Sequence, residues 1–289
     1  MRTWFITGTS TGFGKLLTLD LLAAGERVVA TARKVHDLAV LTAVAGDVGN
    51  RLITLPLDVT DDTRVKAAIH EAIGMTAGID VLVNNAGYGY MAPQEEGNLD
   101  EIRAMFDVNV FGLIAVTQAM LPHFRERGAG MIVNLSSIGG RAATPRGGFY
   151  QSTKWAVECL SQAVFLEGSR YGLKVRVIEP GAYDTDFGTR SIRVHPAVAD
   201  GTSAYQPWFH EWLEASSHIF KYGRQDPLEV VRALRESVDR PDGFLRVPVG
   251  RDTADYLAIR DNQSDEEYFA TMRSYGYGLS PEQPFPHGE

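Results

Sequence analysis

Short apolar segments alternate with longer helical patterns through the first two thirds of the chain. The expected strands cover residues 4–7, 28–31, 52–55, 81–83, 131–135 and 174–178, and the expected helices cover residues 13–24, 38–45, 63–73, 99–125 and 150–171. Strands that are apolar along their whole length and separated by helices form a parallel sheet buried on both faces. The sequence therefore predicts an α/β fold, a doubly wound parallel sheet of the Rossmann type.

The chain of 289 residues contains no repeat, low-complexity tract or linker that would divide it, so we expect a single domain. Residues 1–185 form the expected cofactor-binding and catalytic core. Residues 186–222 are rich in Gly, Pro, Ser and aromatic side chains without a clear period, which is typical of a substrate lid. Residues 223–289 are expected to form C-terminal helices and a Pro-rich tail over 281–289.

Charge and cysteine content exclude several classes of protein. The 28 Lys and Arg residues against 36 Asp and Glu residues give a net charge of −8 without a basic block, so we expect neither nucleic acid nor a membrane surface as a partner. No apolar run reaches the roughly 18 residues of a membrane span, and we expect no signal peptide. Cys159 is the single cysteine, which fits a reducing, cytoplasmic location. The seven histidines show no ligand spacing, so no metal is expected.

A glycine-rich turn follows the first expected strand. It reads Thr7-Gly8-Thr9-Ser10-Thr11-Gly12-Phe13-Gly14 and leads into the first expected helix. Such a turn lets the backbone approach a pyrophosphate, and the helix N-terminus offers N–H groups and a positive dipole end. Ordinary strand-to-helix turns also use glycine, but the position after the first strand favours dinucleotide binding.

Arg33 stands at the end of the second expected strand, 19 residues after Gly14. An acidic residue at this place binds the adenosine ribose hydroxyl of NAD, whereas an arginine accepts the 2′-phosphate of NADP. Arg33 can pair with that phosphate through two hydrogen bonds, with Lys34 as a helper. The alternative is a solvated arginine at a strand end, and we predict NADP(H) as the cofactor.

Four further motifs occur in the order of a known family. They are Asp58-Val59, Asn84-Asn85-Ala86-Gly87, Asn134-Leu135-Ser136-Ser137-Ile138-Gly139-Gly140 and Tyr150-Gln151-Ser152-Thr153-Lys154. With the glycine turn, they resemble the short-chain dehydrogenase/reductase family over about residues 2–190, and within it the hydroxysteroid and retinol dehydrogenase-like members. The resemblance implies an oxidoreductase that moves a hydride between a nicotinamide and a carbonyl or alcohol carbon.

Tyr150 and Lys154 share one helix face, since residues four apart lie on the same side of a helix. A free phenol has a pKa of about 10, and a nearby ammonium is expected to lower the pKa of Tyr150 by about 1–3. Tyr150 is therefore the expected acid–base group. The resemblance also implies that Lys154 binds the nicotinamide ribose and that Ser137, 13 residues before the tyrosine, stabilises the reacting oxygen. It further implies that Asn109 holds a water behind Lys154, and the alternative for Asn109 is a helix cap or a core amide.

The remaining cofactor contacts follow from the same resemblance. We expect Asp58 and Val59 to contact the adenine. We expect the backbone of Asn85, Ala86 and Gly87 to pass beneath the adenosine ribose. The nicotinamide carboxamide is expected to be held by the turn that contains Pro180, Gly181, Tyr183 and Thr185. Tyr183 departs from the family's usual aliphatic residue. A plain strand-to-helix turn is the alternative for residues 84–87.

Aromatic side chains predict a hydrophobic small-molecule substrate. Trp208, Phe209 and Trp212 fit one helical face above the nicotinamide, although this face could instead pack on the body of the enzyme. The other expected pocket residues are Tyr88, Tyr90, Met91 and Phe149, with Ser137 and Tyr150 as the polar groups. Few basic residues lie nearby, so a multiply charged phosphate substrate is not expected.

Two other functions fit parts of the pattern. A non-catalytic NADP(H)-sensing protein could use the same fold, but the complete set of Ser137, Tyr150 and Lys154 argues against it. A nucleotide-sugar epimerase or dehydratase also uses a Tyr–Lys pair, but those chains show a different glycine motif and a larger substrate domain. Family members usually form homodimers or homotetramers through the helices that correspond to 99–125 and 150–171, and we expect the same here.

Overall fold

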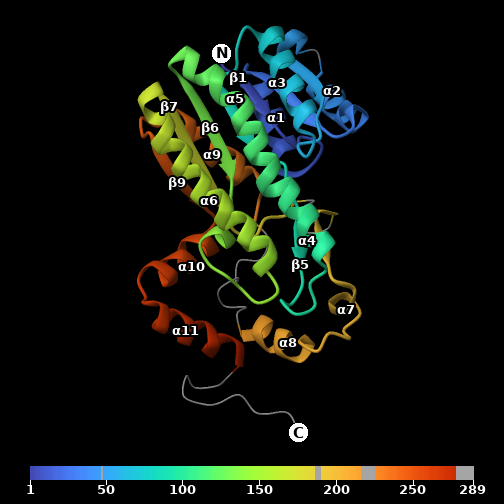
Figure 1. The fold of residues 1–289 in the computed structure, drawn as a ribbon, viewed down its shortest axis with the longest axis vertical. Coiled ribbons are helices and arrows are strands. Elements are labelled where there is room, and N and C mark those ends of the chain that lie inside the picture. The colour runs from blue at the N-terminus through green and yellow to red at the C-terminus, as the bar shows by residue number, and fades with distance from the viewer. Residues whose placement is uncertain (47, 186–189, 216–224, 278–289) are drawn as a thin grey trace.

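The computed structural model describes residues 1–46, 48–185, 190–215 and 225–277 (Figure 1). Parts of the expected lid (186–189 and 216–222) and the whole Pro-rich tail lie outside the described residues. So do the side chains of Trp208 and Trp212, although the backbone of their helix is described.

The core of the molecule is a sheet of seven parallel strands in the order β3-β2-β1-β4-β6-β7-β9. The strands are β1 Thr3–Ile6, β2 Arg27–Ala32, β3 Leu52–Pro56, β4 Val81–Asn84, β6 Gly130–Leu135, β7 Leu173–Pro180 and β9 Phe244–Val249. The strand order runs outward in both directions from β1 and β4, so the predicted doubly wound fold is confirmed. The chain forms a single domain of this fold. The strand β9 was not among the six strands predicted from the sequence.

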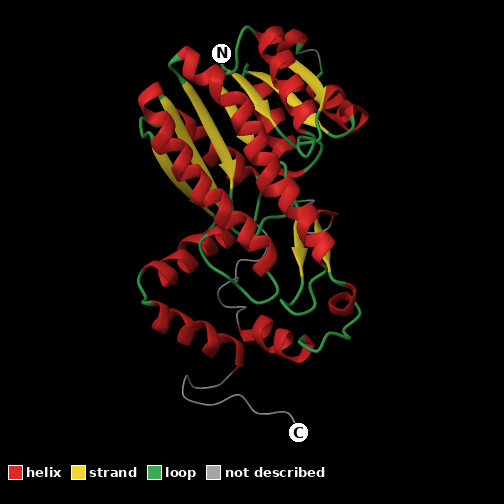
Figure 2. Cartoon of the chain, viewed as in Figure 1, coloured by secondary structure: helices red, strands yellow, loops and turns green. Residues whose placement is uncertain are grey.

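Helices cover both faces of the sheet (Figure 2). Apolar side chains of α1 Gly12–Ala23, α2 Ala39–Ala45 and α9 Leu228–Asp239 pack on one face. Those of α3 Asp62–Thr76, α5 Leu113–Arg127 and α6 Gly148–Gly168 pack on the other. Short 3-10 turns at Val35–Leu38, Gly49–Arg51, Ile138–Gly140 and Ser169–Tyr171 complete these layers. This burial on both faces explains why most of the strands are predominantly apolar.

A smaller group of elements lies beyond the carboxyl ends of the strands, in the lower part of Figure 1. There β5 Gly89–Met91 pairs in parallel with β8 Ile192–Val194. The helices of this part are α7 Pro196–Ala199, α8 Gln206–Ala215, α10 Arg251–Asp261 and α11 Asp265–Tyr277. Ligands of doubly wound sheets bind at this edge, so the segments after residue 190 are placed where they can cover a bound molecule.

The expected helix over residues 99–125 is continuous but not uniform. It consists of α4 Leu99–Phe106, a π-helical turn Asp107–Gly112 and α5. By length and composition, the whole run Leu99–Arg127 could cross a membrane, contrary to the expectation that no apolar run is long enough. Its residues Val116, Met120 and Phe124 are buried in the core, however, and the core helix of a globular protein passes the same test.

Candidate active site

The glycine turn after β1 packs against the chain that follows β4. Gly8 has φ +70°, and a Cβ atom there would lie 2.9 Å from the Cα of Ala86. A Cβ on Gly14 would lie 2.5 Å from the Gly8 carbonyl oxygen. Both positions therefore require glycine. Gly12, the first residue of α1, has φ +55°, and a Cβ there would meet nothing within 4 Å, so this side of the turn is open.

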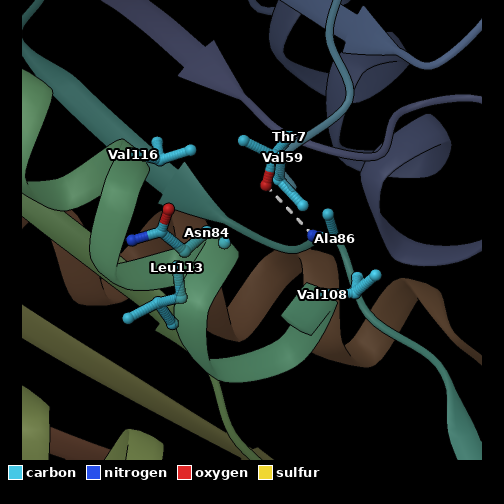
Figure 3. Close-up of a pocket in the computed structure, with 8 residues that line it drawn as sticks. Thr7, Val59, Asn84, Ala86, Val108, Leu113 and Val116 are labelled. Carbon is cyan, nitrogen blue, oxygen red and sulfur yellow. Dashed lines mark hydrogen bonds between the residues drawn. The ribbon is translucent and has the colours of Figure 1, made fainter. Parts of the chain in front are cut away.

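Side-chain hydrogen bonds hold the two segments together. The Nδ2 of Asn85 donates to the carbonyl oxygens of Thr7 and Gly8, each at 2.9 Å. The Oγ1 of Thr7 accepts from the backbone N–H groups of Asn85 and Ala86, each at 3.0 Å. Figure 3 shows the bond from Ala86. A small pocket opens behind this junction, lined by Thr7, Val59, Asn84, Ala86, Val108, Gly112, Leu113 and Val116. The side chain of Asn85 is thus used to fix the turn.

Residues expected near the adenosine lie at the carboxyl ends of β2 and β3. Arg33 and Lys34 are exposed directly after β2. The Arg33 charge reaches Tyr88 and acts to lower its pKa, although burial raises the pKa of Tyr88 overall. The carboxylate of Asp58 accepts from the N–H and the hydroxyl of Thr60, at 3.0 and 2.8 Å. Arg33, Lys34 and Asp58 therefore follow the carboxyl ends of two paired strands, at the same edge of the sheet as the glycine turn.

Three predicted catalytic residues meet at the ends of β6 and α6. The Ser137 hydroxyl hydrogen bonds to the Tyr150 hydroxyl, which acts to lower the pKa of Tyr150. Ser137 also accepts from the N–H of Gly139 at 3.1 Å, as the cap of the turn Ile138–Gly140. Ser136 is buried, and among the described residues its hydroxyl has no hydrogen-bond partner. The serine that reaches the tyrosine is therefore the one chosen from the spacing.

Lys154 lies one helical turn after Tyr150. Its Nζ donates to the Leu135 carbonyl oxygen at 2.7 Å and lies 5.7 Å from the centroid of the Tyr150 ring. Burial lowers the pKa of Lys154 to about 8, while the Glu158 carboxylate acts in the opposite direction.

The expected lowering of the Tyr150 pKa is not found in the protein alone. Part of the Tyr150 ring is exposed, but its hydroxyl is enclosed by protein, and this burial raises the pKa well above its usual value. The Ser137 hydrogen bond opposes the rise without overcoming it. The physical reason is that loss of hydration penalises the phenolate more than its surroundings stabilise it.

Asn109 occupies the π-helical turn between α4 and α5. Its Oδ1 accepts from the N–H of Tyr88 at 3.0 Å, and its Nδ2 donates to the Tyr88 carbonyl oxygen at 2.8 Å and to Thr153 Oγ1 at 3.1 Å. A Cβ on Gly87 would lie 3.0 Å from Asn109 Oδ1 and 3.9 Å from Lys154 Nζ. The side chain of Asn109 therefore fixes the segment around Tyr88 beside Lys154, and its expected role in holding a water behind Lys154 stays a prediction.

The turn after β7 is fixed by the C-terminal part of the chain. Pro180 ends the strand, and the N–H of Gly181 donates to Val249 at 3.1 Å. Tyr183 is buried and packs edge-on against Phe13 of the glycine turn, with ring centroids 5.9 Å apart. The N–H of Thr185 donates to the Tyr183 carbonyl oxygen at 3.0 Å. Two motifs that are far apart in the sequence thus contact each other through Phe13 and Tyr183.

Most of the expected substrate residues gather beside Tyr150. The rings of Tyr90 and Phe149 are stacked with centroids 6.3 Å apart, and Tyr88 and Tyr150 pack against the same apolar cluster. Met91 ends β5, beside Val194 of β8. A second apolar cluster is formed by Ala142, by Tyr256 of α10 and by Tyr268 and Met272 of α11. Phe209 of α8 and Ile138 both pack against this cluster.

Arg146 is a residue that the sequence analysis did not single out. Its guanidinium lies 3.4 Å above the centroid of the Phe209 ring, and its backbone has φ +63°. Its Nε is buried without a hydrogen-bond partner among the described residues, and burial lowers its pKa. It lies between Ser137 and Tyr150 in the chain, which was the only signal available from the sequence. Arg146 therefore connects the catalytic loop to α8.

Over the described ranges, which omit residues 47, 186–189, 216–224 and 278–289, no group of three or more His, Cys, Asp or Glu side chains could hold a metal ion. The reactive side chains that the structure does bring together are Ser137, Tyr150 and Lys154.

Comparison with known proteins gives a consistent result. The family model described as short chain dehydrogenase matches residues 2–193. The oxidoreductase BOA17 of Botryotinia fuckeliana is 35% identical over 260 residues, which is 88% of this chain and 91% of that protein. The human 17-beta-hydroxysteroid dehydrogenase type 1 is 30% identical over 285 residues, which is 96% of this chain and 86% of that protein.

Two solved structures extend the comparison to the fold. A short-chain dehydrogenase from Streptomyces avermitilis has a TM-score of 0.77 and 33% identity, covering 91% of this chain and 94% of that one. A gluconate 5-dehydrogenase from Burkholderia cenocepacia, in complex with NADP and tartrate, has a TM-score of 0.72 and 28% identity, covering 88% and 95%.

Proposed function

The chain belongs to the short-chain dehydrogenase family and is an oxidoreductase of CH–OH and C=O groups, and from this premise we propose that it is an NADP(H)-dependent enzyme for hydrophobic carbonyl compounds or secondary alcohols. The observation that carries the proposal is the contact of Ser137 with Tyr150, one helical turn before the buried Lys154. These three groups come from two segments, yet they converge on one point at the carboxyl edge of the sheet. A protein that only sensed the cofactor would not need this set.

The residues around the glycine turn fit a dinucleotide. The open side of Gly12, the close approach of Gly8 to Ala86 and the positive dipole end at the start of α1 would let a pyrophosphate approach the turn. The exposed Arg33 would hold a 2′-phosphate, with Lys34 beside it. In this proposal Asp58 and Val59 contact the adenine side and the turn 180–185 contacts the nicotinamide side. When bound, the cofactor supplies or accepts the hydride.

The protein groups handle the proton and the developing charge. In the direction of reduction, the Tyr150 hydroxyl donates its proton to the substrate oxygen as the carbonyl carbon gains the hydride. The Ser137 hydroxyl donates a hydrogen bond to the same oxygen and stabilises its negative charge. The Lys154 ammonium favours the phenolate left on Tyr150. The raised pKa keeps Tyr150 protonated in the protein alone, so the proton to be donated is present. Positive charge from Lys154 and from an oxidised nicotinamide would lower that pKa toward the range that acid–base catalysis needs.

An apolar wall supports the choice of a hydrophobic substrate. Tyr90 and Phe149 form a stacked pair beside Tyr150, and Phe209 belongs to a second apolar cluster that includes Ile138, the neighbour of Ser137. The name of the human relative, a hydroxysteroid dehydrogenase, supports the same class. The name of the gluconate 5-dehydrogenase and the tartrate bound to it favour a polar substrate instead. The substrate panel described below distinguishes the two classes of substrate.

We also propose that the protein is a cytoplasmic homodimer or homotetramer. Phe111 and Trp155 remain 61% and 48% exposed on the helices that were expected to form the interface. Large apolar side chains at such exposure are typical of surfaces that are covered by a partner. Measurement of the molar mass in solution, for the parent and for Trp155→Glu, tests this proposal.

The function is tested with a panel of ketones and alcohols, bulky and apolar or short and polar, using NADPH, NADH and their oxidised forms. Oxidation or reduction of the nicotinamide is followed by absorbance. We expect turnover of a bulky apolar ketone with NADPH at a higher kcat/KM than that of a short polar ketone. Binding of NADPH without turnover of any substrate would favour the sensing protein instead.

A further inference from the structure

Two buried carboxylates lie behind the catalytic lysine. Glu158 follows Lys154 by one turn of α6 and is 5% exposed, and Glu179 of β7 is fully buried. The proposed reaction uses neither of them. Burying a carboxylate costs several kcal/mol unless it is paired and hydrogen bonded, so the arrangement of their partners shows what the pair can do.

One arginine bridges both carboxylates. The Nε of Arg246, on β9, lies 2.9 Å from Glu158 Oε2 and 3.5 Å from Glu179 Oε1. A second arginine, Arg141, lies 3.4 Å from Glu179 through Nη1 and binds both oxygens of Asp261 at 2.7 and 2.9 Å through Nη2. The Asp261 side chain is about half exposed, so the cluster extends from Lys154 to the surface of α10.

The cluster leaves two carboxylate oxygens without partners. Among the described residues, Glu158 Oε1 and Glu179 Oε2 accept no hydrogen bond. Burial and the neighbouring charge of Glu158 raise the pKa of Glu179 well above its usual value, while Arg141 and Arg246 act to lower it. The pair is therefore not satisfied in the way that a purely structural ion pair would be.

Glu158 is also the charged group that acts on Lys154. Burial disfavours the ammonium form, and among the described residues the Glu158 carboxylate is the main charge that opposes that effect on Lys154. The groups that face Glu158 come from each neighbouring element: Lys154 on its own helix, Glu179 on β7, Arg246 on β9, and Ser136 with Gly140 at the end of β6. Lys154, Arg141 and Arg246 balance Glu158, Glu179 and Asp261 in charge.

We propose that Glu158 is a positioning residue that keeps Lys154 in its ammonium form, and that Glu179, which shares Arg246 with Glu158, supports this effect from β7. The proposal rests on the proposed function of Lys154 in the reaction. It assigns to two glutamates outside the Ser–Tyr–Lys set the control of the pH range in which the enzyme works.

The sign of the effect follows from the charges. Loss of the Glu158 charge removes the group that favours the ammonium, so the pKa of Lys154 falls below about 8. The alkaline limb of the kcat/KM profile, where Lys154 loses its proton, then moves to lower pH. The expected move in Glu158→Gln is about one pH unit. Glu158→Asp keeps the charge and should stay near the parent.

A second readout needs no cofactor and no activity. The pKa of Lys154 is about 8 in the folded protein and near its ordinary value in the unfolded chain, so the unfolded chain binds more protons between these values. Stability due to this group is fully present above the unfolded pKa and is lost as pH falls toward 8. In Glu158→Gln, this loss of stability should continue below pH 8, down to the lower pKa that Lys154 has in the variant. Urea unfolding at a series of pH values measures this window, and Lys154→Met provides the baseline without it.

The matched control is Asp20→Asn, since Asp20 pairs with Arg235 at 2.9 Å on another face of the molecule. The proposal holds if Glu158→Gln moves both the alkaline limb of kcat/KM and the pH range of the stability change to lower pH, while Glu158→Asp and the control move neither. It is overturned if Glu158→Gln moves neither of them. It is also overturned if Glu158→Asp moves them equally, because the effect would then come from side-chain packing and not from charge. If Glu158→Gln does not fold, Glu179→Gln decides: a smaller move in the same direction supports the proposal, and none overturns it. An inactive parent with the stability shift intact would count against the proposed function alone.

Discussion

The Nζ of Lys154 donates a hydrogen bond of 2.7 Å to the carbonyl oxygen of Leu135, the last residue of β6. This bond ties the first turns of α6 to the strand end that leads into Ser137. Tyr150, one turn earlier on α6, is thereby held beside Ser137. The distance between the two hydroxyls is thus set by a strand and a helix, which are more rigid than loops.

Replacement of Tyr150 with Phe should abolish most of the activity without affecting cofactor binding. The ring and its packing remain, while the transferable proton is lost, so turnover should fall by roughly 10²–10⁴-fold. Steady-state kinetics and a fluorescence titration with NADPH measure the two effects. Tyr171→Phe is the control, because Tyr171 is 44% exposed outside the site. Near-normal turnover in Tyr150→Phe would refute the proposed acid–base role.

Arg33→Asp should shift the cofactor preference from NADPH toward NADH. The change removes a partner of the 2′-phosphate and adds repulsion, so the ratio of kcat/KM for NADPH to that for NADH should fall at least about tenfold. The same change at Arg103, which pairs with Asp100 on the surface of α4, should leave the ratio unchanged. A parent enzyme that uses both cofactors equally would contradict the role of Arg33.

Gly8→Ala should destabilise the protein more than Gly25→Ala. Both glycines have positive φ, +70° and +84°, so both variants carry a strain of roughly 1–3 kcal/mol. Only at Gly8 would the new Cβ meet Ala86, at 2.9 Å, whereas nothing lies within 4 Å at Gly25. Urea unfolding should therefore give a larger loss for Gly8→Ala, by about 1–3 kcal/mol. NADPH affinity should also fall only in this variant, and equal losses in both would argue against close packing of the turn.

Arg146→Met should raise KM for the substrate while the affinity for NADPH stays near that of the parent. The loss of its stacking on Phe209 frees the loop between Ser137 and Tyr150 from α8, and the contact itself contributes about 0.5–2 kcal/mol. Arg170→Met is the matched control, since Arg170 lies 5.9 Å from the Tyr171 ring at an exposed position. If KM is unchanged in Arg146→Met, α8 does not border the substrate site.

Sequence patterns predicted six of the seven strands of the main sheet, the edge strand β3 among them, and missed β9 at the opposite edge. Strands such as Val81–Asn84 are buried along their whole length and predominantly apolar, so the pattern indicates them clearly. The strand β9 Phe244–Val249 contains Arg246 and Pro248 and is only partly buried, because it lies at the edge beside β7. Proline is tolerated there because one side of an edge strand needs no hydrogen-bond donors. The strand β9 therefore lacks the continuous apolar pattern on which the prediction depended.

Within the candidate site, features that depend on residues close in the sequence were predictable, and features that depend on distant residues were not. The spacing of Tyr150 and Lys154 on a helix, and of Ser137 before them, was readable because helical periodicity alone brings the pair together. The direction of the shift in the Tyr150 pKa could not be predicted from the sequence, because it depends on how completely the fold removes water from the hydroxyl. The hydrogen bonds of Asn109 to Tyr88 also depended on where the π-helical turn places its side chain.

By itself, the sequence determined the sheet architecture, the family and the Ser–Tyr–Lys set, since these follow from local periodicity and from residues close together in the chain. Only the tertiary structure decided the contacts between distant segments: Phe13 with Tyr183, Arg146 with Phe209, and the bridge of Arg246 between Glu158 and Glu179. No local pattern encodes these contacts. The bridge of Arg246, for example, arises only when α6, β7 and β9 pack together and bring their buried charges within reach of one another.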